Sequence, residues 1–438
     1  MITWLLGGWI CFDFYFSFVI IFFTVIYISF LVSAKKHKQR GSIGSSEYRE
    51  YDEAKKHLST SEEEPPPSSG HDSFFEMRGS LRREFALQAA LDNHGRNMIC
   101  SPISAMMPLG KLVLGAKKTT EKELLSALGL TERKQISTAF RLLITNMEYL
   151  PGVTLDVASR IYVSSKADIN KKFMKRTKKI FKSSCRKIDR SDPSRTARDI
   201  NKWVAEKTKN KITKLLSEND ITEDTSMVLV NAVYFAGAWS NPFPNTFTGD
   251  FHTPTGVRRM PKMSREGTYN YYKSDTLNAQ VIEIPYKGDY CSMVIVLPYS
   301  NDGLPVLLRA LKLAPELLNE ALDRMKSTDV LLTMPKFKIE SEFDLRELYR
   351  KIGLRSMTDR SKSDLTGIVD DETIYVSKAI HKAVIEVNER GTEAAAATGA
   401  VLKPVKGILN MVIFDASRPF LFYISFVQEQ LFAGTFSG

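Results

Sequence analysis

The chain has 438 residues, of which 43% are hydrophobic and 25% are charged, values typical of a protein with a folded core. Lys and Arg outnumber Asp and Glu by 61 to 50, which favours acidic partners, membranes or polyanions but says nothing about the fold. None of the four cysteines forms a C-x-x-C pair, and one lies in an apolar N-terminal stretch, so we expect neither a disulfide framework nor a structural zinc site.

The first predicted elements are a hydrophobic segment and a linker. Residues 14–32 contain no charged side chain, and a helix of that length, at about 1.5 Å per residue, matches the roughly 30 Å of a bilayer's hydrocarbon layer. Residues 1–34 are therefore predicted to be a single-pass membrane anchor, or a signal peptide whose cleavage would give a secreted protein. The few flanking charges leave the side of the membrane open. Residues 35–78, with charged, Ser-rich and Pro-rich runs, predict a flexible linker.

A folded domain is predicted over residues 79–438, and its helices come first. Ser80 is suited to cap a helix that ends before Gly95, and another helix follows Pro102 with its apolar residues on one side. A third helix is predicted to open at residues 119–121 and to end near Gly129.

The basic stretch between Asn170 and Asp189, which contains no acidic residue, predicts a helix with one buried side. Phe173 and Ile180 lie seven positions apart, as do Met174 and Phe181, so one side of the helix is expected to be buried. The other side carries seven basic residues: Lys171, Lys172, Lys175, Arg176, Lys178, Lys179 and Lys182. A solvated basic face is the default interpretation. The sharper hypothesis is a binding site for a polyanion such as a glycosaminoglycan.

Strand patterns dominate the later part of the domain. Residues 227–235 (MVLVNAVYF) are almost continuously apolar, as expected for a strand buried on both faces, and Asn231 within them needs buried hydrogen-bond partners. Further strands are predicted at 281–284, 292–297, 330–334, 384–387 and 419–424. Helices early and strands late indicate an α+β fold rather than regular βαβ alternation.

Common catalytic motifs are absent. The sequence contains no G-x-S-x-G, H-E-x-x-H, G-x-x-x-x-G-K-[ST] or G-x-G-x-x-G. We therefore expect a protein that is not an enzyme, with no catalytic residue, no metal site, no cofactor and no nucleic-acid ligand. We also expect a monomer.

Residues 384–400 (VIEVNERGTEAAAATGA) have two interpretations. Alanine is the best helix former, and Thr392 could cap a helix there. Alternatively, the run is a strand held in reserve, because the alternate residues Thr392, Ala394, Ala396 and Thr398 are all small and would face one side of a sheet. Small side chains could enter between existing strands, whereas larger ones would typically cost about 1–3 kcal/mol each.

The segment VNERGTEAAAATG closely resembles the hinge of inhibitory serpins. Eight more blocks resemble serpin segments in the expected order: NMICSPIS (97–104), INKWVAEKTKNKI (200–212), LVNAVYFAGAW (229–239), IPYKGDYCSMVIVLP (284–298), MPKFKIE (334–340), DLTGI (364–368), SRPFLF (417–422) and LFAG (431–434). The resemblance covers about residues 79–438. It implies an α+β fold of three β-sheets with eight to nine helices and an exposed reactive-centre loop.

The resemblance also implies a set of site residues. The hinge would contain Glu389, Gly391, Thr392, Glu393, Ala394, Ala395, Ala396, Ala397 and Thr398. A polar cluster beneath the opening of the sheet would contain Ser101, Ser104, Asn231 and His381, with Trp239 where insertion begins. The usual count places the cleaved residue at Val405, which suits an elastase-like protease. A shift by one places it at Lys406, which suits a trypsin-like protease, and the loop is longer than in well-known relatives, so both stay open.

By this resemblance, the chain is expected to inhibit a serine protease, or a cysteine protease, as a suicide substrate. The protease cleaves the loop, and the cleaved loop inserts into the central sheet while the acyl-enzyme is still intact. The inward hinge positions carry no bulky or charged residue, which favours an inhibitor. One alternative is a non-inhibitory serpin that acts as a binding or chaperone module. The other is an intracellular inhibitor in which the N-terminal extension plays no part.

Overall fold

The computed structural model describes residues 82–438, except for 149, 151, 165–167, 371, 393–410 and 427–428. The predicted hydrophobic segment 1–34 and linker 35–78 lie outside the described residues. Among the helices that are described, none is long and apolar enough to cross a membrane. The three described cysteines, Cys100, Cys185 and Cys291, are buried free thiols.

Nine α-helices occur in the described part of the chain, within the range expected from the sequence. The first covers residues 82–92, and the others are α4 (Pro102–Val113), α5 (Lys118–Ala127), α6 (Gln135–Glu148), α7 (Lys171–Phe181), α8 (Pro193–Lys207), α9 (Leu304–Leu313), α10 (Glu316–Asp323) and α11 (Leu345–Lys351). Two short 3₁₀ helices are η1 (Glu218–Asp220) and η2 (Ser356–Thr358).

Several helices begin at a side chain that caps them. Asn170 precedes α7, and its Oδ1 accepts hydrogen bonds from the backbone N–H groups of Lys172 and Phe173 at 2.9 and 3.2 Å. Asp192 caps α8 in the same way through the N–H of Arg195. Such caps satisfy donors that have no partner inside the helix.

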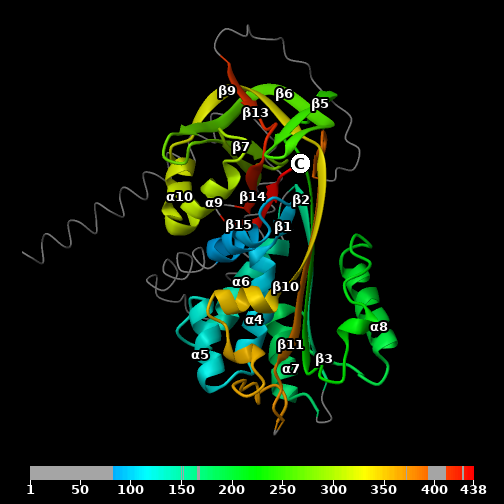
Figure 1. The fold of residues 1–438 in the computed structure, drawn as a ribbon. Coiled ribbons are helices and arrows are strands. Elements are labelled where there is room, and N and C mark those ends of the chain that lie inside the picture. The colour runs from blue at the N-terminus through cyan, green and yellow to red at the C-terminus, as the bar shows by residue number, and fades with distance from the viewer. Residues whose placement is uncertain are drawn as a thin grey trace, which may run out of the picture. The chain divides into compact units, whose positions relative to one another are not determined.

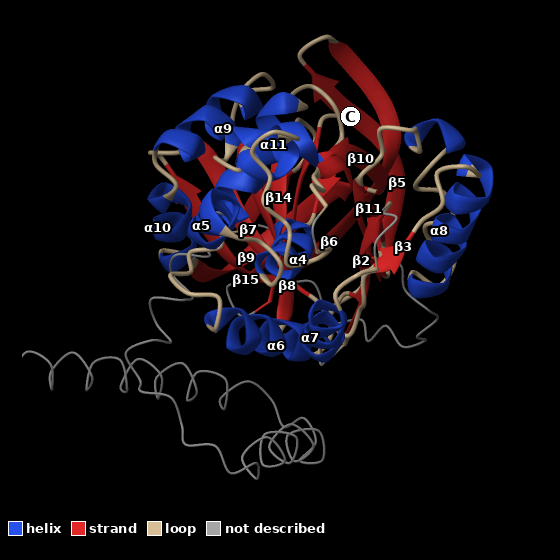
Figure 2. Cartoon of the chain, turned by 90° about the horizontal axis from the view of Figure 1, so that it is seen from below, coloured by secondary structure: helices blue, strands red, loops and turns tan. Residues whose placement is uncertain are grey.

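A six-stranded sheet, here called the central sheet, forms the middle of the domain (Figure 1). Its order is β10 (Phe337–Asp344), β11 (Val376–Asn388), β12 (Gly391–Thr392), β4 (Met227–Ala238), β2 (Val153–Val163) and β3 (Arg186–Lys187). Helix α8 lies on one face of this sheet and α4 on the other (Figure 2). Apolar side chains therefore cover both faces of β4, which explains its continuous apolar run.

The remaining strands form one larger sheet. Its order is β1 (Met98–Cys100), β15 (Glu429–Phe436), β14 (Phe420–Phe426), β8 (Cys291–Pro298), β7 (Ala279–Pro285), β6 (Gly256–Ser274), β9 (Lys326–Pro335) and β13 (Val412–Asp415), with β5 (Asn245–Thr253) also paired to β6. The long strand β6 joins two of the three expected sheets into this one. It pairs with β7 near its end, at 270–274, and with β5 near its start, at 256–264.

Candidate functional site

The central sheet contains a seam, defined here as the direct pairing of β11 with β4. The two strands run parallel, and their register extends from Val376 opposite Met227 to Val384 opposite Tyr234. Beyond Val384 the strands separate, and the two-residue strand β12 lies between them, antiparallel to both. The predicted hinge thus begins inside the sheet, at one end of the seam.

Gly391 and Thr392, the two residues of β12, fit this place through their small size. Gly391 has a φ of +154°, and a Cβ there would lie 2.1 Å from the carbonyl oxygen of Gly237, so only glycine can adopt this position without displacing β4. Thr392 is fully buried, and its Oγ1 lies 2.7 Å from the hydroxyl oxygen of Tyr286. Thr392, the first inward position of the predicted hinge, is therefore already packed in the core.

Trp239 holds the turn that leads from β11 into β12. Its indole stacks on Tyr286 at 4.6 Å between ring centroids, and its Nε1 donates a hydrogen bond to the carbonyl of Asn388 at 2.9 Å. Its backbone N–H donates to the carbonyl of Arg390 at 2.9 Å. Glu389 forms an ion pair with Lys336 at 2.6 Å, and this contact lowers the pKa of the carboxyl group.

The predicted polar cluster is brought together across the seam. His381 on β11 lies directly opposite Asn231 on β4, and its Nδ1 lies 2.5 Å from the Asn231 Oδ1. The backbone N–H of Ser101 donates to His381 Nε2 at 3.1 Å, so the ring proton resides on Nδ1 and is donated to Asn231. Asn231 in turn donates to the carbonyl of Ser104 at 2.8 Å, while the Ser104 hydroxyl donates to Asn231 Oδ1 at 2.9 Å. All four side chains are fully buried.

This arrangement links strands and has no geometry for catalysis. Burial lowers the pKa of His381 to about 3, so the ring is neutral at physiological pH. Both ring nitrogens are engaged, and the Ser101 hydroxyl donates to the carbonyl of Leu431 at 2.7 Å. Within the described residues, no group of three or more His, Cys, Asp or Glu side chains is placed to hold a metal ion.

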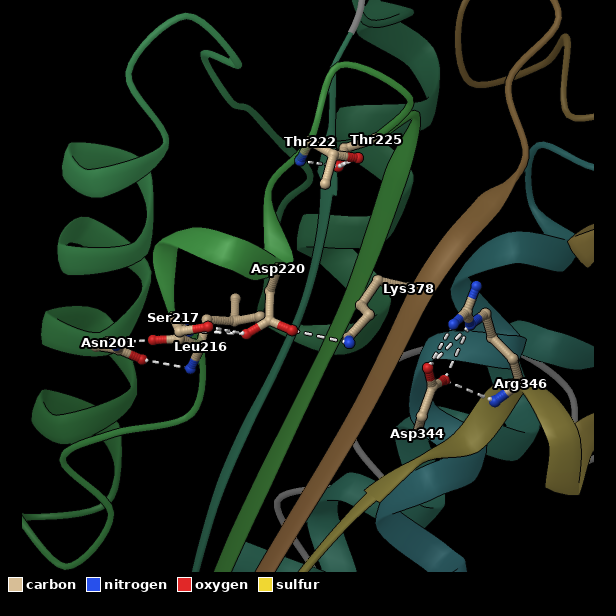
Figure 3. A network of polar contacts seen from close by, with 9 residues as sticks. All are labelled: Asn201, Leu216, Ser217, Asp220, Thr222, Thr225, Asp344, Arg346 and Lys378. Atoms are coloured by element: carbon tan, nitrogen blue, oxygen red, sulfur yellow. Dashed lines mark hydrogen bonds and ion pairs between the residues drawn. The ribbon is translucent and has the colours of Figure 1, made fainter.

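The other face of the central sheet carries a second set of contacts across the seam. Lys378 on β11 extends to the segment that connects α8 to β4 and forms an ion pair with Asp220 of that segment at 2.8 Å (Figure 3). Lys382, also on β11, donates to the carbonyl of Lys214 at 2.8 Å. Asn201 of α8 fixes the same segment, because its Oδ1 accepts from the N–H groups of Leu215 and Leu216.

Helix α7 forms over the predicted basic segment. Phe173, Ile180 and Phe181 are buried and Met174 is partly buried, whereas all seven predicted basic side chains are exposed. Lys182 pairs with Glu148. In the part of the chain that is described, no ion pair engages the other six, so their charges are not neutralised locally.

Several predicted site residues lie outside the described residues: Glu393, Ala394, Ala395, Ala396, Ala397, Thr398, Val405 and Lys406. Other residues of the site were not predicted as part of it. Tyr286 and Lys336 lie in motifs read from the sequence, but nothing in their spacing indicates that they contact the hinge. Lys111, whose Nζ donates to the carbonyl of Ser159 on β2, could have been found from the sequence, because it is the one charged residue of the helix α4.

The sequence and the fold of the chain are similar to those of known proteins. The family model described as "Serpin (serine protease inhibitor)" matches residues 82–437. Antichymotrypsin-2 of Bombyx mori is 36% identical and covers 79% of this chain and 92% of its own length. Antitrypsin of the same organism is 35% identical and covers 79% and 89%. The solved structure of native protease nexin-1 with heparin has a TM-score of 0.75 and 27% identity, covering 84% of this chain and 99% of its own.

Proposed function

Because the chain belongs to the serpin family, whose members named above include an antitrypsin and an antichymotrypsin, we propose that it inhibits a serine protease as a suicide substrate. The protease serine attacks the loop carbonyl and forms an ester, and the peptide C-terminal to the cleaved bond leaves with a new amino terminus. The part still esterified to the protease then extends β12 through the seam. This movement carries the protease away before water can hydrolyse the ester.

The main support for this proposal is the position of β12 between β11 and β4. It is a strand already started between β11 and β4, and it is antiparallel to both. Each further residue that enters replaces one parallel contact between β11 and β4 with antiparallel contacts on two sides. Antiparallel pairing is slightly more stable per residue than parallel pairing, and the second ladder is new, so insertion is favourable.

The register of β12 predicts how far insertion would proceed. Thr392 lies opposite Gly237 on β4 and Val387 on β11. Continued antiparallel pairing would bring residue 402 opposite Met227, where β4 begins. The inserted strand would then comprise residues 391–402. Pro404, which has no N–H for a ladder, follows soon afterwards.

The same register gives Thr398 a role. It would lie opposite Asn231 on one side and His381 on the other, which are now hydrogen-bonded to each other. A strand between them would double their separation, since neighbouring strands lie about 4.8 Å apart. The Thr398 hydroxyl is the group that would take over this buried hydrogen bonding. We therefore assign Thr398 to the same site as the polar cluster.

The test is to mix the full-length chain with trypsin and, separately, with elastase. We expect a band at the summed mass that survives denaturant, and mass spectrometry of the released peptide to show whether the protease cleaves after Val405 or Lys406. Thr392→Arg is the control, because an arginine cannot replace the buried threonine under Tyr286 and should convert the inhibitor into a substrate. Clean cleavage of the wild type without a stable band, over a wide panel of proteases, would instead support the non-inhibitory binding role.

We further propose that the seven exposed basic side chains of the α7 segment bind a sulfated polysaccharide. The supporting observations are that six of the seven form no ion pair among the described residues, and the similarity to protease nexin-1, whose structure was solved with heparin. Replacing Lys175, Lys178 and Lys179 by Ala should lower the salt concentration that elutes the protein from heparin-agarose. The matched control replaces three exposed lysines of the α8 region, Lys202, Lys207 and Lys214. Equal shifts for the two variants would mean that only net charge matters.

A further inference from the structure

Lys111 is a buried lysine that the proposed mechanism does not use. It lies in α4, whose twelve residues are all buried, and it is 3% exposed. Its Nζ donates hydrogen bonds to the carbonyl oxygen and the hydroxyl of Ser159 on β2, at 2.6 and 3.1 Å. The Phe181 ring lies 5.6 Å from the ammonium group. Lys111 therefore ties α4 to the strand next to β4.

Within the part of the chain that the structure describes, no carboxylate compensates the charge of Lys111. Burial lowers its pKa to about 7, with Arg160 of β2 adding to the shift and Cys185, which follows α7, opposing it. Phe181 and Ser183 are the neutral groups nearby, and the Ser183 hydroxyl donates to the Ser159 carbonyl at 2.7 Å. No ion pair engages Lys111 among the described residues. Its charge thus depends on pH within the physiological range, and among the described residues its hydrogen bonds go to Ser159.

Helix α4 and its N-cap are hydrogen-bonded to strands on both sides of the seam, so these contacts cannot all survive when the sheet opens. At its start the N–H of Ser101 bonds to His381 on β11, whereas Lys111 bonds to β2 on the other side. The helix is also fixed to β15 by the Ser101 hydroxyl and to α11 by Tyr349, whose hydroxyl donates to the carbonyl of Ala105 at 2.7 Å. Admitting a strand moves β4 and β2 about 4.8 Å away from β11. If α4 stays with β15 and α11, the Ser104–Asn231 hydrogen bonds to β4 must break and the Lys111–Ser159 contact to β2 must stretch or break.

We propose that Lys111 is a latch that holds β2 against α4 and, while protonated, resists opening of the seam. The proposal rests on the insertion mechanism proposed above and adds its regulation by pH. A protonated amine that loses the Ser159 carbonyl is left as an unpaired buried charge, whereas a neutral amine loses only an ordinary hydrogen bond. Strand insertion should therefore be slower in mild acid than in mild base.

The test uses strand insertion without a protease. The full-length chain is incubated at pH 6 and pH 8.5 with an acetylated synthetic peptide of residues 391–402, and the peptide-bound form is followed on a urea gel. His381 stays neutral at both pH values, and the peptide's single carboxylate side chain stays ionised. We expect wild-type insertion to be about tenfold slower at pH 6, the factor that corresponds to a charge-assisted hydrogen bond. Lys111→Met should insert at one rate at both pH values, at least as fast as the wild type at pH 8.5.

The matched control is Lys262→Met. Lys262 is also buried, at 4% exposed, but it lies on β6, where it contacts Ser417 and Asp415 outside the central sheet. This variant should keep the wild-type pH dependence. If the peptide inserts and Lys111→Met keeps that dependence, or if Lys262→Met loses it too, the latch is refuted while insertion stands. If the peptide enters no variant at either pH, the insertion mechanism and the latch fall together.

Discussion

At the scale of single residues, the site depends on polar side chains that are buried and yet fully hydrogen-bonded. His381 is the clearest case, because both of its ring nitrogens have partners and its neutral form is the one that fits. Replacing one partner would leave the others unsatisfied in the core, which costs more than the hydrogen bond itself. The cluster therefore makes the closed seam specific, and it must rearrange as a unit.

Acid should destabilise the native state through His381. Its pKa is about 3 in the folded protein and near 6.5 in an unfolded chain, so the unfolded state binds a proton that the folded state cannot accept. The free energy of unfolding should therefore fall as the pH decreases from about 6.5 towards 3, by at most about 1.4 kcal/mol per pH unit from this group. Urea denaturation of the wild type and of His381→Gln between pH 7 and 4 measures this pH dependence of the free energy of unfolding. The variant should show a shallower pH dependence, and identical slopes would contradict the prediction.

Gly391→Ala should expel β12 from the sheet. A Cβ at this position overlaps the carbonyl of Gly237, and the backbone conformation is one that alanine rarely adopts. We expect faster amide hydrogen exchange in Gly391, Thr392 and the facing residues of β4, with little change at the opposite end of the seam. Gly256→Ala is the control, because it also has a positive φ but lies in open space in a distant hairpin. Unchanged exchange around Thr392 would show that β12 tolerates the side chain.

At the scale of elements, the seam is bridged on both faces. The polar cluster lies on the α4 side, and the Asp220–Lys378 ion pair lies on the α8 side (Figure 3). In the proposed mechanism, the contacts of the α8–β4 connection with Lys378 and Lys382 of β11 would have to break when the strands part. These contacts would therefore be part of the barrier to insertion.

Lys378→Met should accelerate insertion of the 391–402 peptide. The ion pair with Asp220 is partly exposed, so its loss is expected to be worth roughly 0.5–1 kcal/mol, or about two- to fivefold in rate. Arg346→Met is the matched control, since Arg346 forms an ion pair with Asp344 at 2.6 Å in the same region without crossing the seam (Figure 3). A larger acceleration in the control than in Lys378→Met would assign the effect to surface charge in general.

Much of this architecture was predictable from the pattern of the sequence. The apolar run at 227–235 lies within β4, and the segments predicted at 292–297 and 330–334 lie within β8 and β9. Strand β6 was missed, because its exposed polar side chains give no apolar pattern and only its partners on both sides make it a strand. The contact of Thr392 with Tyr286 joins residues 106 positions apart, which no local pattern encodes. The serpin resemblance, rather than periodicity, indicated which polar residues meet at Asn231.

At the scale of the whole molecule, the intact chain is expected to be less stable than its cleaved form. Cleavage in the loop would release residues 393–402 to complete the strand, which adds ladder hydrogen bonds on two sides. We expect the melting temperature to rise after cleavage at Val405 or Lys406, as calorimetry would record. Thr392→Arg, cleaved in the same way, should not show this rise. A cleaved wild type that melts like the intact protein would rule out insertion.

The N-terminal segment should decide where the inhibitor acts. If residues 1–34 are retained as an anchor, the full-length chain will cosediment with liposomes in high salt, because hydrophobic insertion is insensitive to screening. A variant that lacks residues 1–34 should stay in the supernatant and inhibit its protease equally well. Recovery of a shortened chain from the medium of expressing cells would instead identify the segment as a cleaved signal peptide.

The short strand β12 also has a consequence for timing. Under the proposed mechanism, an acylated protease would be either released by water or captured by the inserting strand, and the ratio of these two rates would set how many inhibitor molecules are consumed per protease inhibited. The slowest step in adding a strand is the formation of its first backbone pairs, because the loss of chain entropy comes before any stabilising contact forms. In this molecule Gly391 and Thr392 have formed the first rungs before the protease arrives. Insertion would therefore compete with hydrolysis of the ester without first having to nucleate the strand.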